Sequence, residues 1–316
     1  MRKEEFTFDS RDGKTKLYAC KWIPEQEQPI CIVQIIHGMR EHIGRYEEFA
    51  QYLADRGVLV VGHDHLGHGK SVPIGETYGY FCENDAATVT VRDAHRLKKI
   101  TEEQYPHIPY ILLGHSMGSF MVRNYIAKYG TGIEGAILSG TGTPTKAELL
   151  FGMSLAKIIG TVRGWKYVSR MLIKLSSDSY MKGITDAKTE HDWLSRDDEL
   201  IHKYAEDSLC TGYQFTVNGY HTLYDLAYRM QKKQNMQNIP KKLPILIVSG
   251  TEDPVGKKGL APKKLYDDYL NLDLTKATLK LYNGARHEVL NEKDRNKVFA
   301  DLYSWVERVA MEVSGK

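Results

Sequence analysis

The sequence predicts an α/β protein with a mostly parallel sheet, helices on both faces and a helical insertion. Three observations carry this prediction. Strand and helix signals alternate through residues 1–143 and again from residue 241 onward, which is typical of parallel sheets. The run from Cys31 to Ile36 is apolar except for Gln34, as in a strand covered on both faces. Between residues 144 and 240 no convincing buried strand occurs.

The first part of the chain contains elements bounded by turn and cap signals. The opening hairpin turns at Asp12-Gly13, and Gly57 ends the first helix, because glycine and aspartate favour these positions. The predicted elements are a hairpin over 6–22, strands over 31–36, 58–62, 110–113 and 135–139, and helices over 45–56, 88–104 and 119–129.

The helical insertion interrupts this alternation. It opens with apolar residues at helical spacing from Leu149 to Trp165, continues through polar loops and closes with a helix over 220–235. Strands then resume at 244–249 and 277–282, and a helix over 295–311 ends the fold. We therefore expect a core made of residues 1–143 and 241–316, with residues 144–240 forming a cap over the active site.

Composition is that of an enzyme with one large domain. The chain has 316 residues, of which 42% are hydrophobic and 26% are charged, enough to bury a sizeable core. A net charge of +3 without a long basic run argues against nucleic acid as a partner. The polar start and the lack of a run of about 20 apolar residues favour a cytoplasmic location. The cysteines, expected to be reduced and without metal-ligand spacing, are Cys20, Cys31, Cys82 and Cys210.

The segment Gly114-His115-Ser116-Met117-Gly118 stands between an apolar strand and a helix with Phe120, Met121, Tyr125 and Ile126 on one face. Gly-x-Ser-x-Gly in that setting is the nucleophile elbow, a tight turn that exposes the serine hydroxyl. The bare pattern is weak evidence, so the flanking elements decide. We predict that Ser116 is a nucleophile and not a buried turn serine.

A serine hydroxyl needs a base, which an acid in turn orients. On this scaffold the acid and then the histidine are expected after later strands. Asp253 follows the predicted strand at 244–249, and His287 follows the strand at 277–282. Glu252 remains an alternative acid, and an Asp-Pro pair such as Asp253-Pro254 is also common in plain turns. The other downstream histidines, which no predicted strand end holds, are His191, His202 and His221.

The oxyanion formed during acyl transfer needs two hydrogen-bond donors. One is the backbone N–H of Met117, directly after the nucleophile. The second is expected in the loop that follows the strand at 31–36, where Gly38 permits close approach and Met39 N–H is the preferred donor over neighbouring amides.

Five histidines near these loops allow a metal-binding interpretation. Zinc requires three or four convergent ligands, whereas these residues lie on two different loops. We interpret them as packing groups hydrogen-bonded to the backbone, and expect no metal and no cofactor. They are His37, His42, His63, His65 and His68.

Three motifs together carry a family resemblance. They are His37-Gly38-Met39-Arg40-Glu41-His42 with Arg45-Tyr46, Asp64-His65-Leu66-Gly67-His68-Gly69-Lys70-Ser71, and Gly114-His115-Ser116-Met117-Gly118. They resemble the monoacylglycerol lipase / lysophospholipase branch of the α/β-hydrolases, which is often grouped with serine aminopeptidases. In the cap, Asp207-Ser208-Leu209-Cys210 and the stretch 215–219 are similar to bacterial lysophospholipases. The resemblance implies the α/β-hydrolase fold, a triad of Ser116, Asp253 and His287, and oxyanion donors at Met39 and Met117.

The predicted function is a serine carboxylic-ester hydrolase that cleaves a small lipid-like ester, a monoacylglycerol or lysophospholipid, through an acyl-enzyme. One alternative is an aminopeptidase or amidase on the same triad, and another is a non-catalytic binding protein on a hydrolase fold. No oligomeric state is predicted. An aminopeptidase would need carboxylates for the substrate amine, and the cap offers Glu190, Asp192, Asp197, Asp198, Glu199, Glu206 and Asp207.

Candidate substrate-binding residues are Leu149, Leu150, Ile158 and Cys210. Cys210 is either a thiol near the acyl pocket or an inert buried cysteine.

The cap is locally basic and apolar. Such a segment can dock transiently on an anionic membrane. The alternative is that these apolar residues line the acyl pocket and have no membrane role. Between Pro144 and Gly183 the cationic residues are Lys146, Lys157, Arg163, Lys166, Arg170, Lys174 and Lys182, against Glu148 and Asp178.

Overall fold

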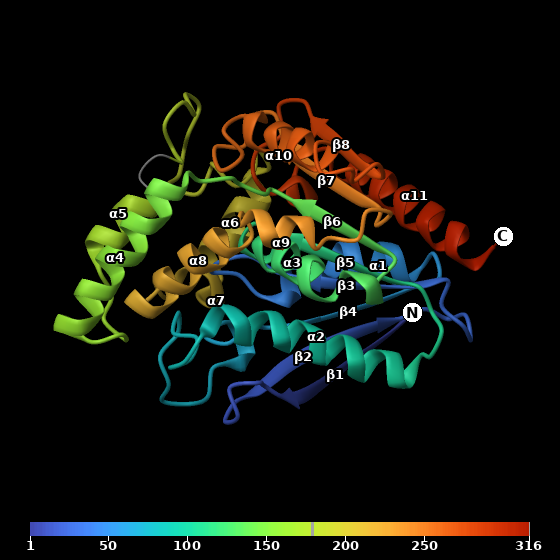
Figure 1. Cartoon of the computed structure of the whole chain (residues 1–316), viewed down its shortest axis with the longest axis horizontal. Coiled ribbons are helices and arrows are strands. Elements are labelled where there is room, and N and C mark those ends of the chain that lie inside the picture. Colours follow the sequence, from blue (N-terminus) through green and yellow to red (C-terminus); the bar gives the residue numbers. More distant parts are fainter. Residues whose placement is uncertain (178–179, 316) are drawn as a thin grey trace.

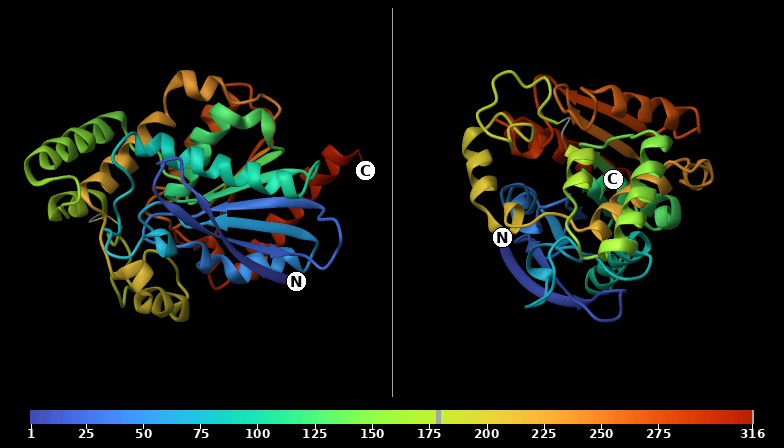
Figure 2. Two further views of the ribbon diagram at one scale, coloured as in Figure 1. Left: turned by 90° about the horizontal axis from the view of Figure 1, so that it is seen from below. Right: turned by 90° about the vertical axis from the view of Figure 1, so that its left-hand side faces the viewer.

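One eight-stranded sheet runs through the computed structural model, which describes residues 1–177 and 180–315 (Figures 1 and 2). The strand order is β1-β2-β4-β3-β5-β6-β7-β8. The pairs β1–β2 and β2–β4 are antiparallel, and every later pair is parallel. The strands are β1 (Arg2–Asp9), β2 (Lys16–Ile23), β3 (Cys31–Ile36), β4 (Val58–His63), β5 (Tyr110–His115), β6 (Gly135–Ser139), β7 (Ile245–Gly250) and β8 (Ala277–Tyr282).

Alternate residues of β3 pack into two separate cores, which explains why all of its residues except Gln34 are apolar. Gln34 is buried, donates to the Ala94 oxygen and accepts from Tyr110 O–H. Ile32 and Ile36 join the core formed with helices α2, α3 and α10, whereas Val33 and Ile35 join the core formed with α1 and α11. Side chains on the two faces of a strand alternate, so a central strand covered on both sides needs apolar residues on both faces. These helices are α1 (Glu47–Ala54), α2 (Ala86–Gln104), α3 (Met117–Tyr129), α10 (Leu260–Leu270) and α11 (Arg295–Ser314).

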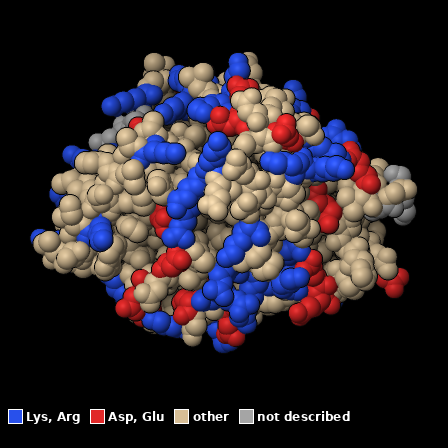
Figure 3. Space-filling view, viewed as in Figure 1, with Lys and Arg blue, Asp and Glu red and all other residues tan. Residues whose placement is uncertain are grey.

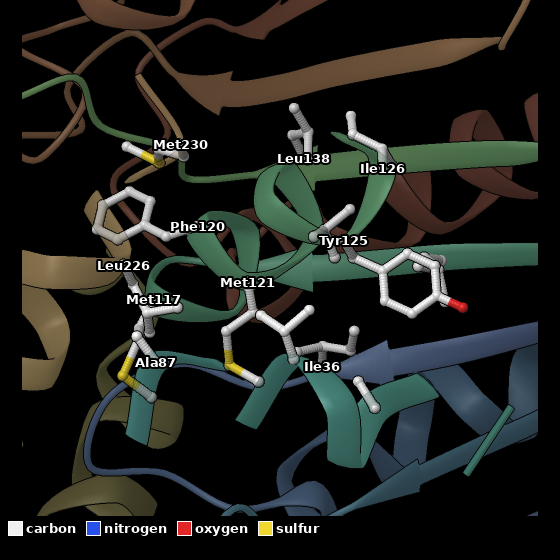
Figure 4. Packing of buried hydrophobic residues seen from close by; sticks show 14 of the residues in the cluster. Ile36, Ala87, Met117, Phe120, Met121, Tyr125, Ile126, Leu138, Leu226 and Met230 are labelled. Atoms are coloured by element: carbon white, nitrogen blue, oxygen red, sulfur yellow. The ribbon is translucent and has the colours of Figure 1, made fainter. Parts of the chain in front are cut away.

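Helix α3 follows the elbow and anchors it. The four residues predicted for its buried face, Phe120, Met121, Tyr125 and Ile126, are at most 6% exposed. Figure 4 shows them among Ile36, Ala87 and Leu138, which come from β3, α2 and β6. The start of α3 is therefore fixed by core packing.

The chain between β6 and β7 is helical, without a strand in its described residues. Helix α4 begins with a capping box in which Thr145 and Glu148 bond each other's backbone N–H, an arrangement that satisfies two free helix-end donors. It packs against α8, where the ring of Tyr224 occupies the space that a side chain at Gly152 would need. The helices are α4 (Lys146–Arg163), α5 (Arg170–Ser177), α6 (Asp198–Glu206), α7 (Ser208–Thr211), α8 (Val217–Arg229) and α9 (Lys233–Gln237).

The helical content differs from the sequence-based expectation in three places. Helices α5, α6 and α7 lie where polar loops were expected. The helix expected over 220–235 is broken into α8 and α9, because Lys232 between them has an extended backbone, with φ −65° and ψ 126°. Helix α10 was not predicted. It is rich in charged residues and carries Pro262 in its first turn, where a missing N–H costs nothing. No helix among the described residues is long and apolar enough to cross a membrane.

Candidate active site

Ser116 occupies a strained turn between β5 and α3. Its backbone has φ 51° and ψ −118°, a conformation that side-chain-bearing residues rarely adopt. A Cβ at Gly114 would overlap the carbonyl oxygen of Gly118, and one at Gly118 would overlap that of Ile36. Ser116 N–H donates to the Ser139 oxygen at 2.9 Å. The two glycines are thus required by close backbone approach, as the elbow pattern predicts.

Asp253 and His287 meet at the carboxyl ends of β7 and β8. His287 Nδ1 lies 2.9 Å from Asp253 Oδ1, and both side chains are fully buried. The Asp253 carboxylate also accepts hydrogen bonds from Ser249 Oγ and from Val255 N–H. Glu252, the alternative acid, instead pairs with Lys258 at 2.8 Å on the surface. Of the two neighbouring carboxylates, only Asp253 contacts the histidine.

The environment of this pair sets its protonation. Burial disfavours both charged forms, but the two groups stabilise each other, so the pKa of Asp253 lies below its ordinary value and that of His287 above. His287 Nε2 is buried and has no hydrogen-bond partner among the described residues, so no Ser116–His287 hydrogen bond is formed here. Such bonds are often long before substrate binds.

His115 packs beside His287, with ring centroids 4.8 Å apart. Burial and the nearby His287 lower the pKa of His115 to about 3. Its ring is therefore neutral and adds no positive charge next to His287.

The loop after β3 lies directly against the serine. A Cβ at Gly38 would lie 3.1 Å from Ser116 Cβ, so glycine allows this close contact. Gly38 N–H donates to the Glu41 carboxylate. By contrast, the N–H groups of Met39 and Met117 make no hydrogen bond within the described chain. Both residues that the sequence predicts as oxyanion donors therefore carry an N–H group that is free within the described chain.

A buried ion-pair network, which the sequence analysis missed, joins this loop to the histidine loop. Arg45 donates two hydrogen bonds of 2.7 Å to Glu288 and one of 3.0 Å to Glu41. Tyr46 O–H also donates to Glu41, at 2.9 Å. Arg45 holds the pKa of Glu288 at about 2 despite burial, whereas burial raises the pKa of Glu41 even beside Arg45. Arg45 and Glu288 are 243 positions apart in the sequence, so no local pattern could reveal their contact.

A cavity of about 610 Å³ opens above Ser116 and His287, between the core and the helical insertion. Leu149 lines it, as predicted. Leu150 and Ile158 do not line it and are 48% and 63% exposed, because neighbouring positions of α4 point about 100° apart around the helix. Cys210 is completely buried but does not line the cavity either. At these three positions the structure differs from the sequence-based prediction.

Three of the five loop histidines are buried and hydrogen-bonded to backbone oxygens, as predicted. The prediction is wrong for His63, which within the described chain is hydrogen-bonded only to the His65 ring. It is incomplete for the part-buried His42, which bonds the Asp207 side chain as well as a backbone N–H. His37 Nδ1 contacts the Gly38 oxygen, His65 Nε2 the His37 oxygen and His68 Nδ1 the Leu66 oxygen, at 2.8–3.0 Å. Burial lowers the pKa of His63 to about 3 and that of His68 to about 4.

Donor atoms of His42, Asp207 and Cys210 lie within 4.8 Å of one another. His42 Nε2 already contacts Asp207 at 2.7 Å, and burial raises the pKa of the Cys210 thiol. A metal would need the thiolate, so this cluster is better described as a hydrogen-bonded contact between the β3 loop and the insertion.

Comparison with known proteins places these features in context. A family model described as "Serine aminopeptidase, S33" matches residues 27–294. The monoacylglycerol lipase of Mycolicibacterium smegmatis is 28% identical over 297 residues, which cover 93% of this chain and 94% of that protein. The monoglyceride lipase of Homo sapiens is 29% identical over 298 residues, covering 91% and 86% respectively. The thermostable carboxyl esterase of Bacillus coagulans, solved in complex with glycerol, is 27% identical and superposes with a TM-score of 0.89 over 98% of this chain and 99% of that one.

Proposed function

This chain belongs to the Serine aminopeptidase, S33 family and is a carboxylic-ester hydrolase, and from that premise we propose that it cleaves a small lipid-like ester with Ser116, His287 and Asp253. The fold is the α/β-hydrolase fold expected from the sequence motifs. The proposed substrates are monoacylglycerols or lysophospholipids. Residues 144–240 act as a cap on the core made of residues 1–143 and 241–316.

The proposed reaction proceeds through an acyl-enzyme. Ser116 Oγ attacks the ester carbonyl carbon while His287 Nε2 takes its proton, and the N–H groups of Met39 and Met117 stabilise the oxyanion. The imidazolium then gives its proton to the leaving alcohol. Water, deprotonated by the same histidine, attacks the acyl-enzyme, and the carboxylic acid departs. Asp253 fixes the imidazole so that Nε2 faces the serine and stabilises its charged form.

One observation supports this proposal most strongly. The unpaired Nε2 of a histidine held by a buried aspartate lies in the same cavity as the serine of a strained elbow. This combination serves a nucleophile and its base, and a merely structural serine would not need it.

The cavity lining favours an ester over a peptide with a free amine. Of the seven cap carboxylates considered for amine binding, only Glu190 lines the cavity, and its side chain is 86% exposed. Glu148, a further cap carboxylate in the lining, is also exposed and is bonded to Thr145. A free α-amino group needs carboxylates shielded from water for strong pairing. The family description alone therefore does not select aminopeptidase chemistry for this chain.

The test is hydrolysis of p-nitrophenyl esters of increasing acyl length beside an aminoacyl p-nitroanilide. We expect turnover of the esters, with a preference set by the length of the acyl pocket, and negligible turnover of the anilide. Preferential cleavage of the anilide would contradict the proposal. The Ser116→Ala variant is the matched control for non-enzymatic hydrolysis.

We also propose that α4 and α5 dock transiently on anionic lipid surfaces. Both lie at the outer edge of the molecule (Figure 1), and they expose Ile158, Val162 and Met171. Lys and Arg residues are interspersed with uncharged ones over this end (Figure 3). In such a segment, apolar contact with the lipids and attraction between the cationic side chains and anionic headgroups both contribute to membrane affinity. Asp178, counted above against the cations of this segment, lies outside the described residues.

Co-sedimentation with vesicles tests this docking. We expect binding to anionic vesicles that weakens at high salt and in the Val162→Ser variant. Equal, negligible binding to anionic and neutral vesicles would contradict the docking and leave these residues as ordinary exposed surface.

A further inference from the structure

Arg40 is held in place beside the candidate active site, yet its charged end has no partner among the described residues. It follows Met39 and has φ 54°, in the left-handed region that disfavours most side-chain-bearing residues. Two hydrogen bonds of 3.3 Å hold it there, from Tyr204 O–H to its carbonyl oxygen and from its Nε to the Cys210 oxygen. Its two terminal nitrogens make no hydrogen bond or ion pair within the described chain, and the residue lines the cavity.

The carboxylates around Arg40 are occupied or solvated. Glu41 and Glu288 are both bound by Arg45, and Glu190 is largely exposed, 3.7 Å from His191. Burial lowers the pKa of His191, and the charge of Arg40 lowers it further while Glu190 opposes the shift. Arg40 is therefore the fixed cation of this part of the cavity.

The two sides of the cavity differ in chemistry. Helices α4, α5 and α8 contribute an apolar side that suits an acyl chain, whereas Arg40, His191 and Tyr204 contribute a polar side. The leaving alcohol takes its proton from His287, whose ring lies 5.1 Å from that of Trp193. Trp193 is two positions from His191 in the chain, so this proton donor borders the polar side of the cavity. The apolar lining residues include Leu149, Ile173, Leu175 and Leu223.

We infer that Arg40 forms an anion subsite for the leaving alcohol, so that the enzyme favours esters whose alcohol carries a phosphate group. A guanidinium presents its terminal N–H groups as a planar fork that matches phosphate oxygens. This inference rests on the proposed ester hydrolysis. It selects, within the lipid-like esters, a glycerol phosphate over an uncharged glycerol as the leaving group.

The test compares kcat/KM for 1-lauroyl-glycerol-3-phosphate with that for 1-lauroylglycerol, both below their critical micelle concentrations. We use the ratio because a change next to Met39 can slow both reactions. Arg40→Asn removes the charge while tolerating the left-handed backbone, and Arg40→Lys restores a charge without the fork. Lys257→Asn is the matched control, because Lys257 is also a cavity-lining cation with a left-handed backbone, at φ 50°.

We expect the ratio to fall about tenfold or more in Arg40→Asn, as for a lost charge-assisted hydrogen bond. It should recover in part in Arg40→Lys and stay within about twofold in Lys257→Asn. An unchanged ratio in Arg40→Asn, an equal fall in both Asn variants, or a wild-type enzyme that cleaves only the uncharged ester would overturn the inference. If the wild-type enzyme cleaved neither ester nor any p-nitrophenyl ester, the proposed function itself would fail.

Discussion

The guanidinium of Arg45 and the carboxylate of Glu288 form a buried, two-pronged ion pair with both N···O distances at 2.7 Å. Glu288 directly follows His287, and Arg45 also bonds Glu41, which accepts the N–H of Gly38. One arginine therefore connects the loop that carries the proposed oxyanion donor with the loop that carries the proposed catalytic histidine.

We expect Arg45→Met to lower kcat by about tenfold or more with a smaller change in KM. The substitution should displace the two loops and the groups that they position, whereas the contacts that bind the substrate should change less. It should also reduce the free energy of unfolding by about 3–5 kcal/mol, since two buried carboxylates lose their partner. Steady-state kinetics and urea unfolding measure the two effects. Arg295→Met is the control, because Arg295 pairs with the exposed Glu48 at 2.9 Å. A loss of stability with kcat unchanged would contradict a role in positioning catalytic groups and would show that the Arg45 network only stabilises the fold.

The pH dependence of kcat/KM should follow His287. The proposed reaction requires the neutral form of His287, and the Asp253 carboxylate raises the pKa of His287 above 6.5 in spite of burial. Activity should therefore be low at acid pH and rise with an apparent pKa above 6.5. In Asp253→Asn the apparent pKa should shift downward, because the stabilising negative charge is gone. A profile whose midpoint stays at the same pH in that variant would mean that another group controls the rise.

The two neighbouring carboxylates after β7 should differ sharply in effect. Asp253→Asn should lower kcat by roughly 10⁴-fold, because the amide favours the wrong imidazole tautomer. Glu252→Gln should change activity by less than about threefold, because it removes only a surface ion pair. Ester kinetics of the two variants measure the difference. If Glu252→Gln were the more damaging change, the acid would be misassigned by one residue.

Cys210 should be unreactive toward maleimide in the native enzyme. It is fully buried, and burial raises the pKa of its thiol, so the reactive thiolate is scarce. Mass spectrometry after maleimide treatment should show no modification of Cys210 and unchanged ester hydrolysis. Rapid inactivation that a bound acyl analogue prevents would instead place the thiol next to the acyl pocket.

The sequence was most informative where a local pattern has one structural solution. The apolar run of β3 and the elbow around Ser116 were both found from local sequence, and Asp253 and His287 followed from the positions of β7 and β8. Each of these depends on a strand and the few residues after it. The catalytic roles of these residues stay predictions.

The sequence was least informative where distant segments meet. The contacts of Arg45 with Glu288 and of Arg40 with Cys210 join loops that lie over 160 residues apart, and charge alone does not reveal such pairs. Within α4, the direction in which Leu149 and Leu150 point depends on the packing of α4 against α8. The apolar periodicity predicted the helix there, but it did not predict which of the apolar residues line the cavity.

The most direct test of Ser116 as the nucleophile is to locate the residue that a serine-directed fluorophosphonate labels. We expect one adduct per chain, located by peptide mass spectrometry at Ser116, together with complete loss of ester hydrolysis. Ser116→Ala should take up no label, should keep its thermal unfolding midpoint and should lose ester turnover by several orders of magnitude. Labelling of a different residue, or an Ser116→Ala variant that retains more than a few per cent of ester hydrolysis, would contradict the assignment of Ser116 as the nucleophile.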